Sequence, residues 1–203
     1  MILLCCAVEK ELSFWQPRED VETLITGVGP VEAAAAVAAA LGARRYTLVV
    51  SAGLGGAFDG AAQIGDGVVV ADDRMEIDLE NGEPIRLPQG AHTVERASSD
   101  AALVAAMQER GFAALRGITV SRVTSSEATA QRLAVAGAQI ESMEGFAVLR
   151  ASERAGITAI EVRGISNRCG ARESSRWSFE TGIMGLRHVV TALFECYGQE
   201  YSR

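Results

Sequence analysis

Short apolar runs bounded by Gly or polar residues recur along this chain and alternate with helical patterns, which limits its fold more than any other feature. Each run has the length of a buried strand, and most are apolar at consecutive positions rather than at every second one. Strands that are apolar on both faces belong in a sheet covered on both sides. The predicted strands span residues 2–8, 22–27, 46–52, 67–73, 118–124, 138–143 and 158–166.

Helical spacing of apolar residues fills the segments between several of these runs. We therefore predict an α/β fold, one domain over residues 1–203, with a mixed, mostly parallel central sheet flanked by helices. A hydrophobic content of 48 % with only 5 % aromatic residues suits close packing of helices on a sheet. Residues 78–95 look like an irregular surface excursion. The predicted helices span 31–43, 100–111, 128–137, 145–156 and 179–198.

Charge and metal-binding residue types exclude two classes of partner. The formal net charge is −7, and no basic stripe follows a predicted helix, so we expect no nucleic-acid partner. The two histidines are far apart and the four cysteines form no C-x-x-C pair, so we expect neither a metal site nor a cofactor. Cysteines without a disulfide framework also favour a reducing compartment.

Membrane features are equally weak in this sequence. The N-terminal MILLCCAVEKEL lacks the basic segment of a signal peptide. No apolar stretch approaches the roughly 20 residues that span a bilayer. We expect a cytoplasmic protein with no membrane partner.

Two acidic residues follow predicted strands and draw attention to one edge of the sheet. Glu11 comes shortly after the first strand, and Glu144 follows the strand at 138–143 where a helix begins. Ligands of open α/β sheets bind at the carboxyl ends of the strands. Taken separately, Glu11 is explained as a solvated acid and Glu144 as an acid at a helix start. Together they indicate a general base and a binder of hydroxyl groups.

The stretch SAGLGGAF (51–58) is predicted to be a Gly-rich turn after the third strand. Gly53 and Gly55 would let the backbone approach a ligand closely. The stretch is neither a dinucleotide fingerprint nor a phosphate loop, because it lacks a following helix and a GK[ST] element. A tight turn without any ligand explains the glycines equally well.

The segment VRGISNRCGARESSR (162–176) ends the last predicted strand and is followed by Trp177. Asn167 is a common turn former, and the arginines after it could form a solvated face. Trp177 could belong to the core. Periodicity alone favours these structural interpretations over a binding site.

Several motifs in order along the chain resemble the purine nucleoside phosphorylase and nucleosidase superfamily, nearest to its methylthioadenosine/S-adenosylhomocysteine nucleosidases. The stretch SNRCGARESSRW further resembles the futalosine hydrolases. These enzymes cleave futalosine, a nucleoside with a hypoxanthine base and a benzoate-bearing arm at the ribose 5′ end, in menaquinone biosynthesis. The motifs are AVEKEL (7–12), TGVGP (26–30), SAGLGGAF (51–58), ESMEG (141–145) and VRGISN (162–167).

The resemblance implies a role for each matched residue. Glu11 matches the acid that activates the attacking water, and Met143 and Glu144 match the pair that holds the ribose. Asn167 matches the residue that faces N7 of the base, which is Asp in the adenine-specific enzymes. An amide can donate to N7 or O6 of hypoxanthine. A site built for one hydrogen-bond pattern rejects the other, so Asn167 favours a 6-oxopurine.

Hydrolysis is favoured over phosphorolysis, because phosphorylases of this superfamily place arginines in the loops that correspond to AVEKEL and SAGLGGAF, which have none. The alternatives that stay open are a 6-oxopurine nucleoside phosphorylase, an adenine-releasing nucleosidase, and a non-catalytic nucleoside-binding protein. A small-molecule nucleoside is the expected ligand in each case.

Three further expectations come from the resemblance. The segment before MEG carries no aromatic residue to stack on the base, so Phe146, Trp177 or Phe179 would have to replace it. Arg168 or Arg172 is the candidate for binding the carboxylate of the substrate, since a guanidinium pairs with it in a bidentate manner. Related enzymes form dimers or larger assemblies, so we expect a homo-oligomer.

Overall fold

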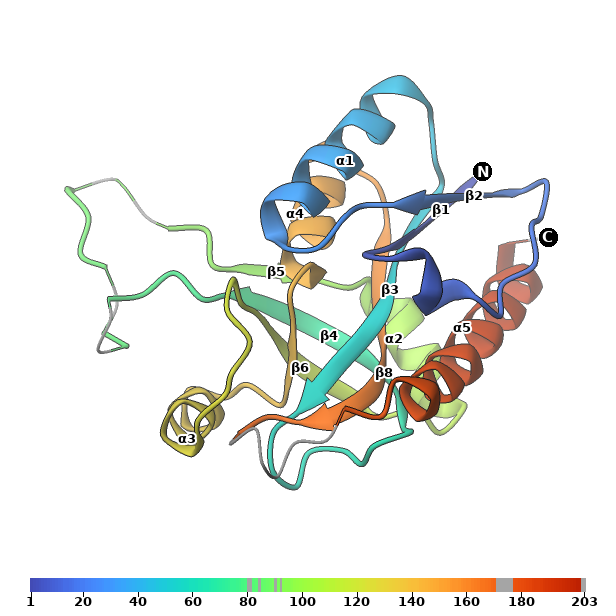
Figure 1. Cartoon of the computed structure of the whole chain (residues 1–203). Helices are drawn as coiled ribbons and strands as arrows, with labels where there is room; N and C mark the ends of the chain where they lie inside the picture. The colour runs from blue at the N-terminus through green and yellow to red at the C-terminus, as the bar shows by residue number, and fades with distance from the viewer. Residues whose placement is uncertain (80–81, 84, 90, 92, 171–176, 202–203) are drawn as a thin grey trace.

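The computed structural model describes the chain except for residues 80–81, 84, 90, 92, 171–176 and 202–203, and it describes no side chains for 199–201. Within the described part, eight strands form one mixed sheet (Figure 1). They are β1 (Ile2–Cys6), β2 (Val21–Ile25), β3 (Leu48–Ala57), β4 (Gly67–Met75), β5 (Arg96–Ser98), β6 (Ala114–Thr119), β7 (Ile140–Ser142) and β8 (Ala159–Arg168).

Strand pairing closes five of these eight strands into a ring. β3 pairs with β8 and with β7, β8 pairs with β4, and β6 joins β4 to β7. β1 and β2 extend the sheet from the first half of β3, and β5 pairs with β4. Five of these pairings are parallel and three are antiparallel, which confirms the predicted mixed, mostly parallel sheet.

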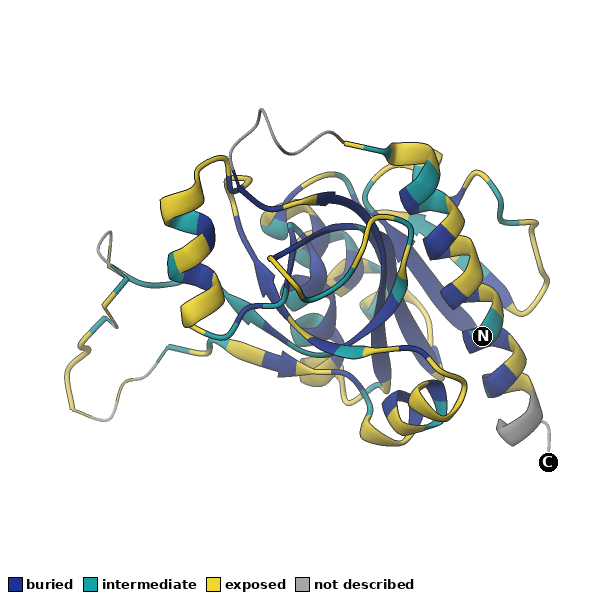
Figure 2. Ribbon diagram, turned by 90° about the horizontal axis from the view of Figure 1, so that it is seen from below, coloured by how far each residue is buried: buried dark blue, intermediate teal, exposed yellow. Residues whose placement is uncertain are grey.

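Helices cover both faces of the sheet. α1 (Pro30–Ala43) and α4 (Gly145–Ala155) pack side by side on one face, and α2 (Ala101–Glu109) and α5 (Phe179–Tyr201) cover the other (Figure 1). α3 (Glu127–Val135) packs at the far end of the closed part. Buried positions concentrate on the strands and on the inner helix faces (Figure 2). The predicted α/β architecture is confirmed.

The helix boundaries follow local signals in the sequence. Gly29, with φ 97°, precedes α1, and Pro30 occupies the first helical position, where its missing N–H has no partner to lose. Asp100 caps α2 by accepting hydrogen bonds from Ala102 N and Leu103 N. Gly156 ends α4 in the left-handed conformation that glycine adopts without strain.

The predicted turn at SAGLGGAF is wrong, because β3 continues through residue 57. Residues 53–57 pair with β8 on one side, and Gly56 and Ala57 pair with β7 on the other. Glycines are uncommon inside a strand unless another group approaches the backbone closely. The short strand β5 and the short helix η1 (Glu9–Leu12) are absent from the sequence-based prediction. The described residues between β4 and β5 extend away from the body, as the expected surface excursion does (Figure 1).

Candidate active site

Glu11 lies on η1, directly after β1, and its carboxylate is held by the backbone. Oε2 accepts hydrogen bonds from Ala7 N at 3.0 Å and Val8 N at 3.2 Å, and Oε1 accepts one from Leu54 N at 2.8 Å. A carboxylate offers about four lone-pair positions, so roughly one is left for a ligand. The loop after β1 and the strand β3 thus fix both the position and the orientation of this group.

Glu144 precedes the first turn of α4, as the sequence predicts. Its Oε1 accepts a hydrogen bond from Gly29 N at 2.8 Å, which ties this carboxylate to the turn before α1. Burial raises the pKa of Glu144, and the nearby cation Arg163 and the Gly29 N–H oppose that rise. Glu144 and Glu11 line the same cavity.

A buried arginine lies beneath the two acids. Arg163 on β8 is 2 % exposed, and its Nε donates to Glu161 Oε1 at 2.8 Å while Nη2 donates to Ser51 Oγ at 3.1 Å. The field of Glu161, Glu144 and Glu11 raises the pKa of this guanidinium. Gly53 leaves room for it, because a Cβ at Gly53 would overlap Arg163 Nη1 and lie 3.1 Å from Glu11 Oε1. Arg163 therefore holds a positive charge between the acids.

Two further acids are buried behind this arginine. Glu161 Oε2 and both oxygens of Asp73 have no hydrogen-bond partner among the described groups. The two carboxyl groups meet beside the start of α4, since a Cβ at Gly145 would overlap both. Burial, followed by the neighbouring charge of Glu161, raises the pKa of Asp73 well above its ordinary value of 3.8. Two carboxyl groups this close do not both ionise readily.

Asn167 also lines the cavity; it lies on β8 and packs against Gly56 of β3. The Ser166 hydroxyl is 2.9 Å from Asn167 Oδ1 and 3.3 Å from Gly55 O, so the shorter contact is to the amide. Asn167 Nδ2 donates to Arg168 O at 3.2 Å. Ser166 takes one lone pair of the amide oxygen and the backbone takes one N–H, so the amide keeps one N–H and one lone pair for a ligand.

Glu141 also lines the cavity, but both of its carboxylate oxygens accept hydrogen bonds from Thr124. Its Oε1 accepts from Thr124 N at 3.0 Å, and its Oε2 accepts from the Thr124 hydroxyl. Burial raises the pKa of Glu141 against the effect of these two hydrogen bonds. The acid therefore fastens the loop after β6 to β7.

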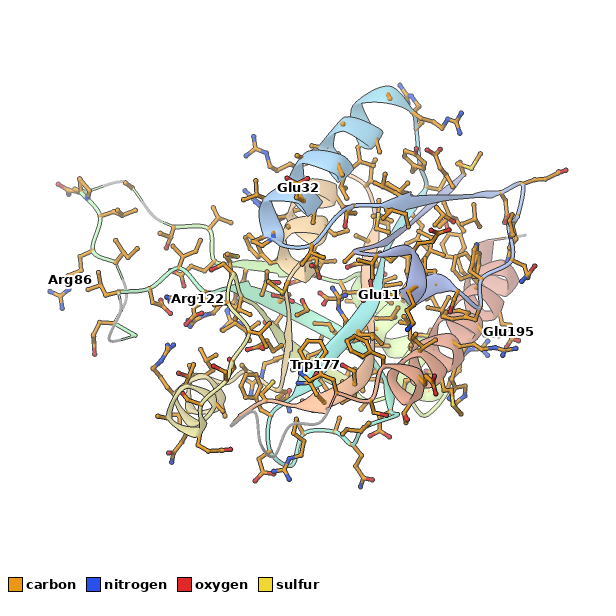
Figure 3. The ribbon with its side chains drawn as sticks, in the orientation of Figure 1. Glu11, Glu32, Arg86, Arg122, Trp177 and Glu195 are labelled. Atoms are coloured by element: carbon orange, nitrogen blue, oxygen red, sulfur yellow. The ribbon has the colours of Figure 1, made fainter. Side chains whose placement is uncertain are left out.

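A cavity of about 300 Å³ joins these groups at the carboxyl ends of β1, β3 and β8. Glu11 and Trp177 lie over the same end of the sheet (Figure 3). Its lining residues are Ala7, Val8, Lys10, Glu11, Val28, Leu54, Gly55, Gly56, Val123, Glu141, Ser142, Met143, Glu144, Ser166, Asn167, Trp177, Phe179 and Ile183.

The structure brings most of the predicted site residues together. The residues that line the cavity are Glu11, Gly55, Met143, Glu144, Asn167 and Trp177.

The other three predicted residues are placed differently. Gly53 lies below the cavity, against Arg163. Arg168 is exposed, pairs with Asp59, and does not line the cavity. Arg172 falls outside the described residues.

Sequence reasoning missed Arg163, Ser166 and Lys10. Arg163 and Glu161 are two charged residues within a predicted buried strand, and this is the signal that could have found Arg163. Of the three aromatic residues considered for stacking on the base, Trp177 and Phe179 line the cavity. Phe146 instead packs with the hydrophobic core beneath α1 and α4.

Neither a membrane span nor a metal cluster is found in the described part. No helix there is long and apolar enough to cross a bilayer. No group of three or more described His, Cys, Asp or Glu residues is arranged to hold a metal ion.

Solved structures resemble this fold over nearly its whole length. A methylthioadenosine/S-adenosylhomocysteine nucleosidase from Colwellia psychrerythraea in complex with adenine has a TM-score of 0.81 at 19 % identity, covering 96 % of this chain and 94 % of that one. A futalosine hydrolase of Helicobacter pylori has a TM-score of 0.79 at 14 % identity, covering 96 % and 97 %. At these identities the likeness establishes the fold.

Sequence relatives are closer. The model of the phosphorylase superfamily matches residues 18–195. The futalosine hydrolase of Streptomyces coelicolor is 37 % identical over 184 residues, 85 % of this chain and 77 % of that protein. The Thermus thermophilus futalosine hydrolase is 31 % identical over 180 residues, 84 % and 79 % of the two chains. These matches confirm the resemblance of the motifs, and the chain belongs to the phosphorylase superfamily and, within it, to the futalosine hydrolases.

Proposed function

We propose that this protein hydrolyses the N-glycosidic bond of futalosine and releases hypoxanthine. The observation that carries the proposal is one cavity lined both by a backbone-held carboxylate, Glu11, and by an oriented amide, Asn167. The futalosine hydrolase relatives support the choice of substrate. The base would lie at the Asn167 end, and the ribose between Glu11 and Glu144.

Cleavage of the bond between N9 and C1′ leaves positive charge on the sugar and negative charge on the departing base. Glu11 and Glu144 supply negative charge near the sugar, where an oxocarbenium-like transition state requires it. Glu11 takes a proton from water as the water oxygen bonds to C1′. The free N–H of Asn167 stabilises electron density that moves onto the imidazole ring of the base. The base is then protonated from solvent and Glu11 releases its proton to solvent, so that water is divided between the sugar and the base.

Asn167 also supports the choice of hypoxanthine over adenine. N7 and O6 of hypoxanthine both accept hydrogen bonds, whereas the 6-amino group of adenine donates them. The Ser166 contact holds the side of the amide that carries Oδ1, and Asn167 has a free N–H to offer to a ligand. A donor facing a donor would cost a buried hydrogen bond, so adenine nucleosides are disfavoured.

The test is the base released in phosphate-free buffer. The purified protein is incubated separately with futalosine, inosine and methylthioadenosine, and the released bases are identified by chromatography and mass. We expect hypoxanthine from futalosine without added phosphate. A strict requirement for phosphate would indicate a phosphorylase, and efficient release of adenine from methylthioadenosine would indicate an adenine nucleosidase.

We also propose a setting for this reaction. The futalosine hydrolase resemblance supports a place in menaquinone biosynthesis and a cytoplasmic location, with no metal or other cofactor. A homodimer or larger homo-oligomer is supported by exposed apolar side chains beside the cavity mouth, among them Val28 and Val31, which are 56 % and 76 % exposed.

A further inference from the structure

One end of the cavity has no role in the chemistry described above. The base occupies the Asn167 end and the ribose lies between the two acids. A wall of the cavity is formed by Val8 and Lys10 from the loop and helix after β1, together with Trp177 and the first turn of α5. Lys10, Trp177 and Phe179 all line the same cavity.

Lys10 stands out on this wall for its charge. It is the only lysine of the chain, and among the described residues that line the cavity it is the only cationic one. Its side chain is exposed and makes no ion pair with a described residue. The other charged lining groups are the carboxylates of Glu11, Glu141 and Glu144. A negatively charged part of a ligand would therefore be attracted to Lys10 and repelled elsewhere in the cavity.

Two aromatic rings stand on the same wall. The ring centroids of Trp177 and Phe179 are 5.2 Å apart with the planes tilted by 41°, and each residue is 45 % exposed. Their partly uncovered faces border the cavity, where a flat ring could stack on them. Exposed aromatic groups that gather at a concave site commonly mark a binding surface.

We propose that this end of the cavity is a subsite for an aryl carboxylate, in which the Lys10 ammonium pairs with the carboxylate and Trp177 and Phe179 contact the ring. This inference rests on the proposed function, because the arm of futalosine ends in a benzoate. The sequence-based candidates were Arg168 and Arg172. The Arg168 guanidinium is paired with Asp59 and does not line the cavity, and Arg172 lies outside the described residues.

The test compares two substrates and two enzymes. kcat/KM is measured for futalosine and for its benzoate methyl ester, with the unaltered protein and with Lys10→Met. We expect Lys10→Met to lower kcat/KM for futalosine about tenfold, as the loss of a charge-assisted hydrogen bond would. Esterification should lower the activity of the unaltered enzyme to a similar extent. Lys10→Met should leave activity on the ester within about twofold, which also shows that the variant is folded.

Further variants separate charge from ring contact. Lys10→Arg should restore part of the activity on the acid, since the charge is kept. Trp177→Leu should lower kcat/KM for futalosine and for its methyl ester to the same extent, because both substrates present the same ring. Arg44→Met, which changes an exposed cation away from the cavity, is the control and should change neither activity. A loss on futalosine with Arg168→Met and none with Lys10→Met would overturn the proposal.

The single lysine permits a measurement of binding without turnover. An amine-specific reagent can modify only Lys10 and the N-terminus of this chain, and mass spectrometry of the peptide that contains Lys10 reports the rate. In a Glu11→Gln background, futalosine should slow modification of Lys10, whereas hypoxanthine should not. Equal rates with and without saturating futalosine would overturn the subsite.

Failure of the subsite and failure of the proposed function give different results. If the unaltered protein releases no hypoxanthine from futalosine, the proposed function is wrong. If it cleaves futalosine and the methyl ester equally well, and Lys10→Met cleaves both as the unaltered protein does, the function stands and the aryl carboxylate subsite is wrong.

Discussion

The carboxylate of Glu11 accepts hydrogen bonds from three backbone N–H groups, and these bonds determine the effect of a substitution at this position. In Glu11→Gln one terminal atom becomes an amide nitrogen, so at least one backbone N–H meets another donor and no base remains for water. We expect kcat to fall about 10²- to 10⁴-fold, as loss of a general base does. Futalosine should still bind, as isothermal titration would show.

Glu9→Gln is the matched control for this change. Glu9 is an exposed acid on the same short helix and does not line the cavity. Its variant should keep nearly full activity. Turnover that survives Glu11→Gln would contradict the mechanism.

Asn167 carries the predicted choice of base. In Asn167→Asp, one carboxylate oxygen can still accept from Ser166 while the other becomes an acceptor toward the ligand. The ratio of kcat/KM for futalosine to that for its 6-amino analogue should fall about 100-fold or more. Competition between the two substrates measures this ratio directly.

Ser166→Ala tests whether the Ser166 hydroxyl orients the Asn167 amide and so contributes to the selection of the base. Without the hydroxyl contact on Oδ1, the amide of Asn167 is free to turn its oxygen toward the cavity. We expect a smaller fall in the same ratio, with both activities retained. An unchanged ratio in both variants would rule out Asn167 as the selecting group.

The buried acid Asp73 is expected to make the stability of the fold depend on pH. Burial beside Glu161 raises its pKa, so the folded protein keeps a proton that the unfolded chain releases above 3.8. Stability therefore decreases as the pH rises from there toward the raised pKa. Asn at position 73 does not titrate. The melting temperature of Asp73→Asn should therefore exceed that of the unaltered protein by a small amount near about pH 4 and by a larger amount near about pH 8.

The control for this prediction is the adjacent Asp72→Asn. Asp72 pairs with Arg96 outside the core, and its loss should give no such increase with pH. A gain from Asp73→Asn that does not depend on pH would contradict a raised pKa in the folded state.

The placement of Glu11, Glu144 and Asn167 beside one cavity could be predicted from a single rule, since each is a polar residue at the end of a predicted strand. Arg163 and Ser166 escaped, because their roles depend on partners far along the chain, such as Ser51 and Gly55 on β3. Lys10 was not identified as a cavity residue, because between Glu9 and Glu11 it was interpreted as part of a solvated charged cluster.

Close packing of α5 on β8 depends on glycine at the contact. A Cβ at Gly164 would overlap Gly182 O and lie 2.6 Å from Leu186 N, both on α5. Gly164→Ala should therefore lower the free energy of unfolding by about 1–3 kcal/mol, the usual cost of overpacking. Urea denaturation followed by circular dichroism measures this change.

Gly198→Ala in the same helix is the control, since its Cβ meets nothing within 4 Å. Alanine is the better helix former by about 1 kcal/mol, so this variant should be slightly more stable. If both substitutions had the same sign, the contact between α5 and β8 would not be the cause.

Strand β3 shows where element prediction failed. Three glycines within SAGLGGAF predict a turn on local propensity alone. In the structure these positions let Arg163, Glu141 and Asn167 approach the strand, and pairing with β7 and β8 keeps it extended. Tertiary contacts overrode the local preference, and a single sequence does not display them.

At the scale of the whole molecule, the order of strands and helices was predictable because each element carries its own apolar pattern. Closure of the sheet through β7 was not predictable. β7 has only three residues, and its antiparallel pairing with β3 links segments more than eighty residues apart. That closure brings the MEG motif beside β3 and completes the cavity.

The surface beside the cavity mouth leads to a prediction about assembly. Ile25, Val28 and Val31 expose apolar side chains around the turn between β2 and α1, and Val28 also lines the cavity. If a second copy covers this surface, a charge at Val31 must be desolvated on association. Val31→Asp should then weaken the homodimer about tenfold or more, as sedimentation velocity over a range of concentrations would show. Val135→Asp, at a site 84 % exposed on α3, is the matched control and should leave the sedimentation coefficient unchanged. A monomeric unaltered protein, or equal effects of the two variants, would contradict an interface at the cavity mouth.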